Sequence, residues 1–234
     1  GHFLKLKKGA KFLFDIRGFY ADERVDGDLW PQSKLMYRLV YKFFKKKEKD
    51  FFLAADYIIS LTYAGKKIML ENKDFEEMKI EVIPCCADIN LFDYNNIQIE
   101  KIIELKNKLK ISDKDYVLTY LGSVGTWYML NEMMQFFAVL KEKYNHAKFL
   151  FITREPEAFI KEFANNNSVN TNDIIIYPAF RDDVPSLISL SDASIFFIKP
   201  LFSKQSSSPT KLAELLGMGV PIICNSNVGD VDSI

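Results

Sequence analysis

The sequence predicts an α/β protein with two parallel sheets, each covered by helices on both faces. Short runs of β-branched and aromatic residues alternate with longer segments of helical period throughout the 234 residues, which is the pattern that parallel sheets produce. The runs form two series, separated by an aperiodic, Asn-containing segment that ends near residue 96. A hydrophobic content of 48% supplies a buried core for both series. We therefore expect one domain over residues 1–95 and a second over residues 96–234.

The individual elements follow from the local pattern. In the first series we expect strands at residues 11–15, 56–60 and 79–84, with helices at residues 33–55 and 63–72. In the second we expect strands at residues 115–122, 148–153, 173–178, 193–200 and 220–225, with helices at residues 97–110, 130–144, 156–165, 183–191 and 209–216. The strand at residues 115–122 is almost continuously apolar, which predicts burial on both faces. Because the first series has fewer strands and both series start or stop abruptly, we expect both domains to be incomplete.

The composition limits the classes of function. Lys and Arg together number 31, as do Asp and Glu, so the formal net charge is zero and no global positive field gathers nucleic acid. The three cysteines lack metal-type spacing and the chain has only two histidines, so we expect no metal site. No apolar run reaches the ~20 residues that a membrane-spanning helix needs, and the first residues lack a signal-peptide core. These features predict a soluble protein of the reducing cytoplasm.

The loop and helix start near residue 208 carry the most informative residues. Ligands of open parallel sheets bind beyond the carboxyl ends of the strands, so a site is expected in the loops that follow them. Ser208 is placed to cap a helix with Pro209 in its first position, and the hydroxyls and free N–H groups there suit a phosphate. Lys211, in the first turn, opposes the helix dipole by about 0.3–1 kcal/mol unless an anion lies between them. Glu214 lies one turn further on and can accept hydrogen bonds from a ribose diol. A capped helix with a solvent-exposed Lys-Glu pair accounts for the same pattern.

Three further loops carry candidate binding residues. In LGSVGTWY (residues 121–128), Gly122 and Gly125 allow the backbone to approach a phosphate closely; an ordinary tight turn is the alternative. In residues 14–30, seven charged side chains lie beside Phe19, Tyr20 and Trp30, which suits a sugar site with an aromatic wall; a solvated loop held by internal ion pairs is the alternative. In residues 177–186, the backbone near Phe180 and Arg181 can contact a nucleobase, or the segment simply begins a helix.

Residues 41–52, within the helix predicted at residues 33–55, combine a basic run with aromatic residues. Such a helix can touch anionic lipid. A solvated helix face explains the same composition, so peripheral contact with the inner membrane face is one of two interpretations.

Three segments together resemble the family 4 glycosyltransferases, particularly a branch associated with bacterial surface polysaccharide synthesis. They are FDIRGFYADERVDG (residues 14–27), EVIPCCADINLF (residues 81–92) and SSPTKLAELLGMGVPIICNSNVGD (residues 207–230). The second segment is similar to the VIPxGVDxxxF phrase that closes the first domain in that family, with Cys86 in place of the usual glycine. The resemblance covers nearly the whole chain. It implies the GT-B architecture, in which two Rossmann-like domains hold the donor mainly in the second and the acceptor in the first.

The resemblance also implies roles for single residues. Glu214 matches the second glutamate of the family's pair of glutamates, the one that binds the donor ribose, whereas the first falls at Ser206. The Arg and Lys that usually hold the diphosphate are absent from GSVGTWY, so we infer that Lys211, with Ser207, Ser208 and Thr210, takes over the charge neutralisation. The expected donor-binding residues are Gly122, Ser123, Gly125, Thr126, Phe180, Arg181, Ser207, Ser208, Thr210, Lys211 and Glu214. The expected catalytic residues are Arg17, Asp22, Glu23 and Lys211.

The implied reaction is transfer of a sugar from a UDP- or GDP-linked donor to a saccharide or lipid-linked acceptor. The nucleoside diphosphate departs with help from fixed positive charge and the helix dipole rather than from a metal or cofactor, and the family implies retention at the anomeric carbon. Two alternatives stay open. A GT-B-like nucleotide-sugar 2-epimerase would use the same diphosphate site without an acceptor, and a chain incomplete at both ends can be an inactive or partner-dependent fragment.

Overall fold

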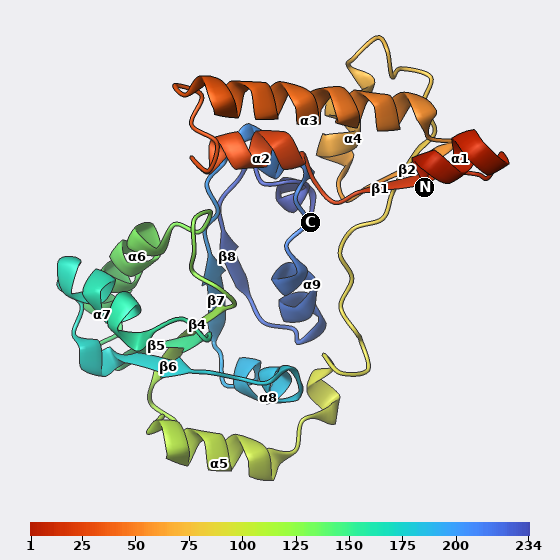
Figure 1. The fold of residues 1–234 in the computed structure, drawn as a ribbon. Helices are drawn as coiled ribbons and strands as arrows, with labels where there is room; N and C mark the ends of the chain where they lie inside the picture. Colours follow the sequence, from red (N-terminus) through yellow and green to blue (C-terminus); the bar gives the residue numbers. More distant parts are fainter. The chain divides into compact units, whose positions relative to one another are not determined.

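The structure, a computed structural model, describes residues 1–234. The chain divides into two compact units (Figure 1). Unit 1 consists of residues 1–85, 199–208 and 226–234, and unit 2 consists of residues 86–198 and 209–225. Two segments from late in the sequence therefore belong to the first unit. The domain boundary between residues 95 and 96 stays a prediction.

Unit 1 is built on a three-stranded parallel sheet in the order β1-β2-β3. Its strands are β1 (Leu13–Ile16), β2 (Tyr57–Ser60) and β3 (Ile80–Val82). Its helices are α1 (His2–Lys8), α2 (Tyr20–Asp26), α3 (Leu35–Ala54) and α4 (Tyr63–Leu70), with 3₁₀ turns η4 (Phe202–Ser206) and η5 (Val231–Ser233). Strand residues Ile58 and Ile80 pack with Phe52 of α3 and Met69 of α4 in one buried cluster. Burial of these side chains holds α3 and α4 on the sheet.

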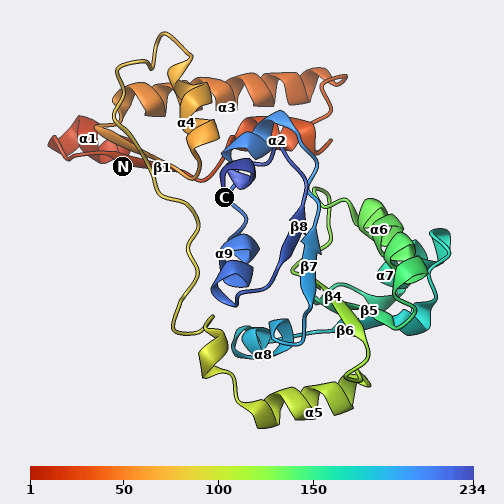
Figure 2. The ribbon, with the colours of Figure 1, turned by 180° about the vertical axis from the view of Figure 1, so that it is seen from behind.

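Unit 2 is built on a five-stranded parallel sheet in the order β6-β5-β4-β7-β8. Its strands are β4 (Tyr116–Leu121), β5 (Ala147–Ile152), β6 (Ile174–Tyr177), β7 (Ala193–Phe196) and β8 (Ile222–Cys224). Its helices are α5 (Ile99–Leu109), α6 (Leu130–Lys143), α7 (Glu157–Asn166), α8 (Val184–Ile188) and α9 (Thr210–Gly217), with 3₁₀ turns η1 (Tyr94–Asn96), η2 (Thr171–Asp173) and η3 (Arg181–Asp183). Figures 1 and 2 show α6 and α7 on one side of this sheet and α9 on the other.

The strand order of unit 2 determines where a ligand is expected. β4, the first strand of the unit, lies in the middle of the sheet, with later strands added on each side of it. The direction of winding reverses between β4 and β7, and the crevice beyond the carboxyl ends of such a pair is the usual ligand site of open α/β sheets. The loops that follow these two strands lead to α6 and to α9.

The structure confirms the predicted fold class, and each of the eight predicted strands is present. From Val117 to Leu121, β4 is buried as its apolar sequence predicts. Two details were wrong. The charged loop predicted at residues 14–30 contains α2. Ser208 does not cap α9: Pro209 occupies the N-cap position, and the Ser208 hydroxyl instead accepts a hydrogen bond of 3.1 Å from the Cys85 N–H.

The segment of residues 199–208 is tied into unit 1 by polar contacts. The Ser206 hydroxyl accepts a hydrogen bond of 3.0 Å from the Phe19 N–H. The buried Lys204 forms an ion pair of 2.6 Å with Glu23, and the Ser203 N–H donates to Asp26 at 2.9 Å. Because buried polar groups need partners, these contacts make α2 and η4 depend on each other. Among the helices, none combines the length and the apolar composition that a membrane span requires.

Candidate functional site

A pocket of about 590 Å³ opens in unit 2 at the carboxyl ends of β4 and β5. Six of the residues expected to bind the donor line it: Gly122, Ser123, Arg181, Thr210, Lys211 and Glu214. They come from the loop after β4, from η3 and from the first turns of α9. The pocket therefore lies where the reversal of strand order predicts a ligand site.

Lys211 is a buried cation in this pocket. The whole residue is only 8% exposed, and Lys211 Nζ donates a hydrogen bond of 3.2 Å to the Tyr120 hydroxyl. The same nitrogen lies 4.3 Å from the centre of the Tyr120 ring and 4.0 Å from that of Tyr128. No carboxylate forms an ion pair with it. Burial lowers the pKa of Lys211 to about 7, although the negative charge of Glu214 opposes the shift. A bound anion would supply the counter-charge that this ammonium group lacks.

Gly122 makes room for the Lys211 side chain. Its φ is +107°, a conformation that residues with a Cβ rarely adopt. A Cβ at this position would lie 3.3 Å from Lys211 Nζ and 3.5 Å from its Cε. Glycine at this position therefore allows the backbone to turn after β4 and leaves space for the Lys211 ammonium group.

Glu214 is buried at the other side of the pocket and is held by Arg181. The residue is 7% exposed, and one carboxylate oxygen accepts a hydrogen bond of 2.9 Å from Arg181 Nη1. The guanidinium of Arg181 in turn lies over the ring of Phe92, with 5.2 Å between Cζ and the ring centre. The arginine fixes the direction of the carboxylate, whose second oxygen can accept from a ligand hydroxyl.

Arg154 also lines the pocket, and sequence reasoning missed it. Its Nη2 donates to the carbonyl oxygen of Ala179 at 3.2 Å, and its guanidinium lies 5.2 Å from the centre of the Phe180 ring. Arg154 is the second residue after the end of β5. Because ligands bind beyond the ends of strands, this position could have identified Arg154 from the sequence. A second exposed cation therefore faces the pocket beside Arg181.

The remaining predicted donor residues lie elsewhere. Gly125 and Thr126 are exposed on the loop after β4, and Phe180 is 72% exposed; none of the three lines the pocket. Ser207 and Ser208 belong to unit 1.

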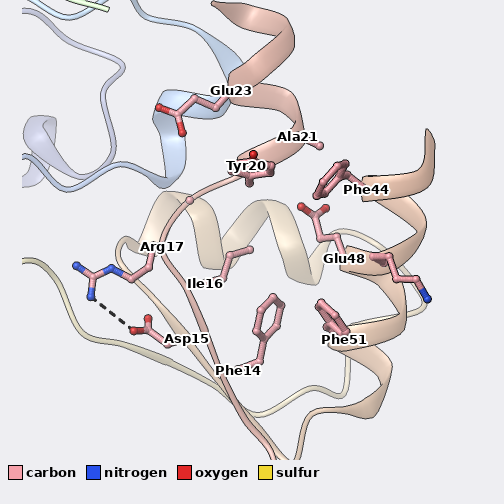
Figure 3. Close-up of a pocket in the computed structure, with 12 residues that line it drawn as sticks. Phe14, Asp15, Ile16, Arg17, Tyr20, Ala21, Glu23, Phe44, Glu48 and Phe51 are labelled. Carbon is pink, nitrogen blue, oxygen red and sulfur yellow. Dashed lines mark ion pairs between the residues drawn. The ribbon is translucent and has the colours of Figure 1, made fainter. Parts of the chain in front are cut away.

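A second pocket, of about 370 Å³, lies in unit 1 between β1, α2 and α3 (Figure 3). Its wall is aromatic, with Phe14, Tyr20, Phe44 and Phe51. Two of the predicted catalytic residues, Arg17 and Glu23, also line it. The Arg17 guanidinium is 3.5 Å from the Asp15 carboxylate, and most of the Arg17 side chain is exposed. Glu23, by contrast, is held by Lys204.

Asp22, the third predicted catalytic residue of unit 1, is buried in a polar network. Its carboxylate accepts hydrogen bonds from the Tyr41 hydroxyl at 2.7 Å and from Lys45 Nζ at 2.8 Å. Burial and the hydrogen bond to Asp22 raise the pKa of Tyr41 to about 12. Burial lowers the pKa of Lys45, but its hydrogen bonds to Asp22 and Glu48 outweigh that effect and raise it. Both of these partners of Asp22 are side chains of α3, so the network joins α2 to α3.

Glu48 is a polar residue of the unit 1 pocket that sequence reasoning missed. Its carboxylate lies among Ile16, Ala21 and Phe44 (Figure 3) and is 2.5 Å from Lys45 Nζ. Burial raises the pKa of Glu48, and the hydrogen bond from Lys45 opposes the shift. The sequence signal that could have identified Glu48 is its position as an acidic residue within a lysine-rich helical segment.

No protein-family model matches the chain, and no curated protein matches it by sequence. Solved structures do match. A glycosyltransferase from Rickettsia africae ESF-5 aligns over 100% of this chain with a TM-score of 0.72 and 21% identity. WaaG, a glycosyltransferase involved in lipopolysaccharide biosynthesis, aligns over 99% with a TM-score of 0.71 and 15% identity. Anabaena HepE, solved in complex with UDP-glucose, aligns over 100% with a TM-score of 0.70 and 12% identity.

These alignments concern part of each solved chain. This chain spans 56% of the Rickettsia protein, 64% of WaaG and 58% of HepE. Within that span, the three-stranded and five-stranded parallel sheets match the two Rossmann-like domains of the neighbours. The chain therefore has the GT-B fold, which it shares with glycosyltransferases.

Proposed function

We propose that the protein transfers a sugar from a nucleotide-diphosphate donor to a saccharide or lipid-linked acceptor. The observation that carries the proposal is the buried ammonium group of Lys211, which lies in a 590 Å³ pocket at the strand-order reversal without an ion-pair partner.

The unit 2 pocket would bind the donor. The diphosphate would contact Lys211 Nζ, with Gly122 and Ser123 offering backbone groups and Thr210 a hydroxyl at the start of α9. The free oxygen of Glu214 would accept from the ribose, and Arg154 and Arg181 add positive charge at the rim. Uridine and guanosine diphosphate sugars both present these groups, and we propose a UDP- or GDP-linked donor.

The unit 1 pocket would bind the acceptor. Aromatic side chains such as Phe14 and Phe51 suit the apolar face of a sugar ring or the first groups of a lipid. Arg17 and Glu48 supply a donor and an acceptor of hydrogen bonds for hydroxyls. The buried contacts of Asp22 and Glu23 favour roles in which these two residues position α2 and η4 rather than react.

In the reaction, an acceptor hydroxyl forms the new glycosidic bond as the bond from the anomeric carbon to the diphosphate breaks. Lys211 and the amino end of α9 stabilise the charge that develops on the departing diphosphate, so no metal ion is required. An oxygen of the departing diphosphate accepts the proton that the acceptor hydroxyl loses. We propose retention at the anomeric carbon, the family 4 type of hexosyl transfer, and a role in surface polysaccharide synthesis at the cytoplasmic side of the membrane.

Calorimetric titration with UDP-glucose and GDP-mannose tests the donor site. We expect one of the two to bind with measurable heat, and an added acceptor to cause release of the nucleoside diphosphate. If neither binds at millimolar concentration while circular dichroism shows a folded protein, the proposal fails. Conversion of the bound sugar without any acceptor would instead identify a 2-epimerase.

A further inference from the structure

Three aromatic rings surround the ammonium group of Lys211. Its Nζ lies 4.0 Å from the centre of the Tyr128 ring, 4.3 Å from that of Tyr120 and 5.9 Å from that of Phe196. The two tyrosine rings meet edge to face, with 5.9 Å between their centres and 82° between their planes. Such a group of rings is an aromatic cage, an arrangement by which proteins bind cationic ligands. Here the cation in the cage is a side chain of the same chain.

The backbone fixes the position of both tyrosines. Tyr120 lies within β4 and is fully buried, and its hydroxyl donates a hydrogen bond to the carbonyl oxygen of Ser123. Tyr128 forms an antiparallel bridge with Ile198, two residues after the end of β7. The sheet therefore holds the two rings, and the lysine side chain reaches them from α9.

Both tyrosines are neutral partners of the ammonium group. Burial raises the pKa of Tyr120 and that of Tyr128 above the ordinary value of a phenol, so both hydroxyls keep their protons near pH 7. Lys211 is the second residue of α9, where the helix dipole disfavours a cation. The ring faces and the Tyr120 hydroxyl oxygen, 3.2 Å from Nζ, therefore offset part of the free-energy cost of burying this charge.

The charged groups of the same pocket leave the ammonium group only partly stabilised. They are Glu214 of α9, Arg181 of η3, and Arg154 and Glu155 after β5. Burial lowers the pKa of Lys211 to about 7, and the charge of Glu214 opposes that shift. Because Arg181 pairs with Glu214, that carboxylate is already engaged. Near pH 7 the charged and neutral forms of Lys211 have similar populations, so a ring face that favours the charged form changes its amount.

We propose that Tyr120 and Tyr128 are positioning residues, which hold the ammonium group of Lys211 at the wall of the unit 2 pocket. Tyr128 lines that pocket, and Tyr120 closes the cage from the buried side. In this arrangement Nζ is ready to contact an anion that enters the pocket. The contact with a donor diphosphate rests on the proposed function, whereas the cage around Lys211 does not.

Replacement of the half-buried Tyr128 tests the cage. Tyr128→Leu keeps an apolar side chain but removes the ring face. In the ligand-free protein, an NMR titration of the Lys211 side chain should give a pKa about one pH unit lower than in the unchanged chain. Affinity for UDP-glucose or GDP-mannose, whichever the unchanged chain binds, should fall roughly tenfold at pH 7.5 and less than about threefold at pH 5.5. The diphosphate of a nucleotide sugar keeps its charge over this range, so low pH restores only the ammonium group.

A graded series at residue 128 separates ring electrons from packing. Tyr128→Phe keeps the ring and should bind like the unchanged chain. One and then three fluorine atoms on the ring of that phenylalanine leave its shape nearly constant but withdraw electrons from its face. The pKa of Lys211 and the affinity at pH 7.5 should therefore fall stepwise. The matched control is Tyr116→Leu, which removes a half-buried ring of β4 that stacks on Tyr144 with 5.1 Å between centres; it should leave both quantities unchanged.

Three results would overturn the proposal. They are an unchanged pKa of Lys211 in Tyr128→Leu, equal values throughout the fluorinated series, and a loss of affinity as large at pH 5.5 as at pH 7.5, which is what a purely structural role produces. If Tyr128→Leu does not fold, the fluorinated series decides. If the folded, unchanged chain binds no nucleotide sugar, the proposed function fails, but the pKa measured without ligand tests the cage independently.

Discussion

Gly122 and Lys211 fit together so closely that a single added methyl group would disturb both. A Cβ at residue 122 would lie 3.3 Å from Lys211 Nζ, and the backbone φ of +107° is itself unfavourable for a residue other than glycine. We expect Gly122→Ala to lower the free energy of unfolding by about 1–3 kcal/mol and to weaken donor binding. Thermal unfolding and titration with a nucleotide sugar measure the two effects. Gly125→Ala is the control, since Gly125 has no positive φ and its Cβ would meet only Ser123 Oγ, at 3.8 Å; equal losses in both variants would contradict this explanation.

Replacement of Lys211 should separate stability from binding. Lys211→Met keeps the apolar stem but removes a buried charge that has no ion-pair partner, so we expect the free energy of unfolding to rise by about 0.5–2 kcal/mol. Binding of the donor should weaken by about 1.5–3 kcal/mol, the range for hydrogen bonds to charged groups. Thermal unfolding without ligand and calorimetry with ligand give the two numbers. An unchanged affinity would remove Lys211 from the donor site.

The affinity for a nucleotide sugar should depend on pH through Lys211. Its pKa of about 7 in the free protein means that the ammonium form dominates below pH 7. A bound diphosphate stabilises that form and raises its pKa, so binding takes up a proton near and above pH 7. Affinity should therefore be highest below pH 7 and fall by roughly tenfold per pH unit above it. Calorimetry in buffers of different ionisation enthalpy measures the proton uptake, and Lys211→Met should show none.

Lys211 should also make the free energy of unfolding depend on pH, but in the opposite direction to the donor affinity. The folded pKa of Lys211 lies below the value of 10.5 that an unperturbed lysine has, so the unfolded chain binds more protons between about pH 7 and pH 10.5. Without ligand, the contribution of Lys211 to the free energy of unfolding should rise with pH through that window. Denaturant unfolding of the unchanged chain and of Lys211→Met, compared at several pH values, isolates this contribution. A constant difference between the two proteins across the window would contradict it.

Glu23 and Arg17 should respond differently to substitution. Glu23→Gln removes the negative charge that faces the buried Lys204, so it should lower the free energy of unfolding by about 1.5–3 kcal/mol. Arg17→Gln changes a largely exposed side chain and should alter stability by less than about 0.5 kcal/mol. If Arg17 contacts the acceptor, its substitution should raise the KM for the acceptor. Thermal unfolding and acceptor-dependent release of diphosphate test both residues, and a stability loss confined to Arg17→Gln would contradict the assignment.

The fold was largely predictable because its signal is local. Runs such as residues 148–153 and 173–178 are apolar and lie at regular intervals between helical segments, so strand number and class follow from the sequence alone. α2 was missed because its seven residues mix four charges with a short apolar pattern, which resembles a polar loop. Its helical state depends on contacts with η4, whose residues lie about 180 positions later in the chain.

The site was predictable only in outline. Lys211 and Glu214 were identified from the start of a helix, but the aromatic surroundings of Lys211 come from Tyr120 and Tyr128, some 80–90 positions earlier. No local pattern contains such a pairing. Ser208 shows the opposite error: a good N-cap residue at the right place in the sequence makes its hydrogen bond to Cys85 instead, because tertiary contacts outweigh a capping preference of about 1 kcal/mol.

The division of the chain has a consequence for biosynthesis. The polypeptide passes between the two units at residues 85/86, 198/199, 208/209 and 225/226. During translation, unit 1 therefore cannot complete its folding until η4 and η5 have been synthesised, and these follow most strands of the unit 2 sheet in the chain. Meanwhile Asp26 and the Phe19 N–H lack the partners that residues 203 and 206 later provide. The nascent first unit would be a natural client for chaperones, and neither unit can be obtained as one uninterrupted stretch of the gene.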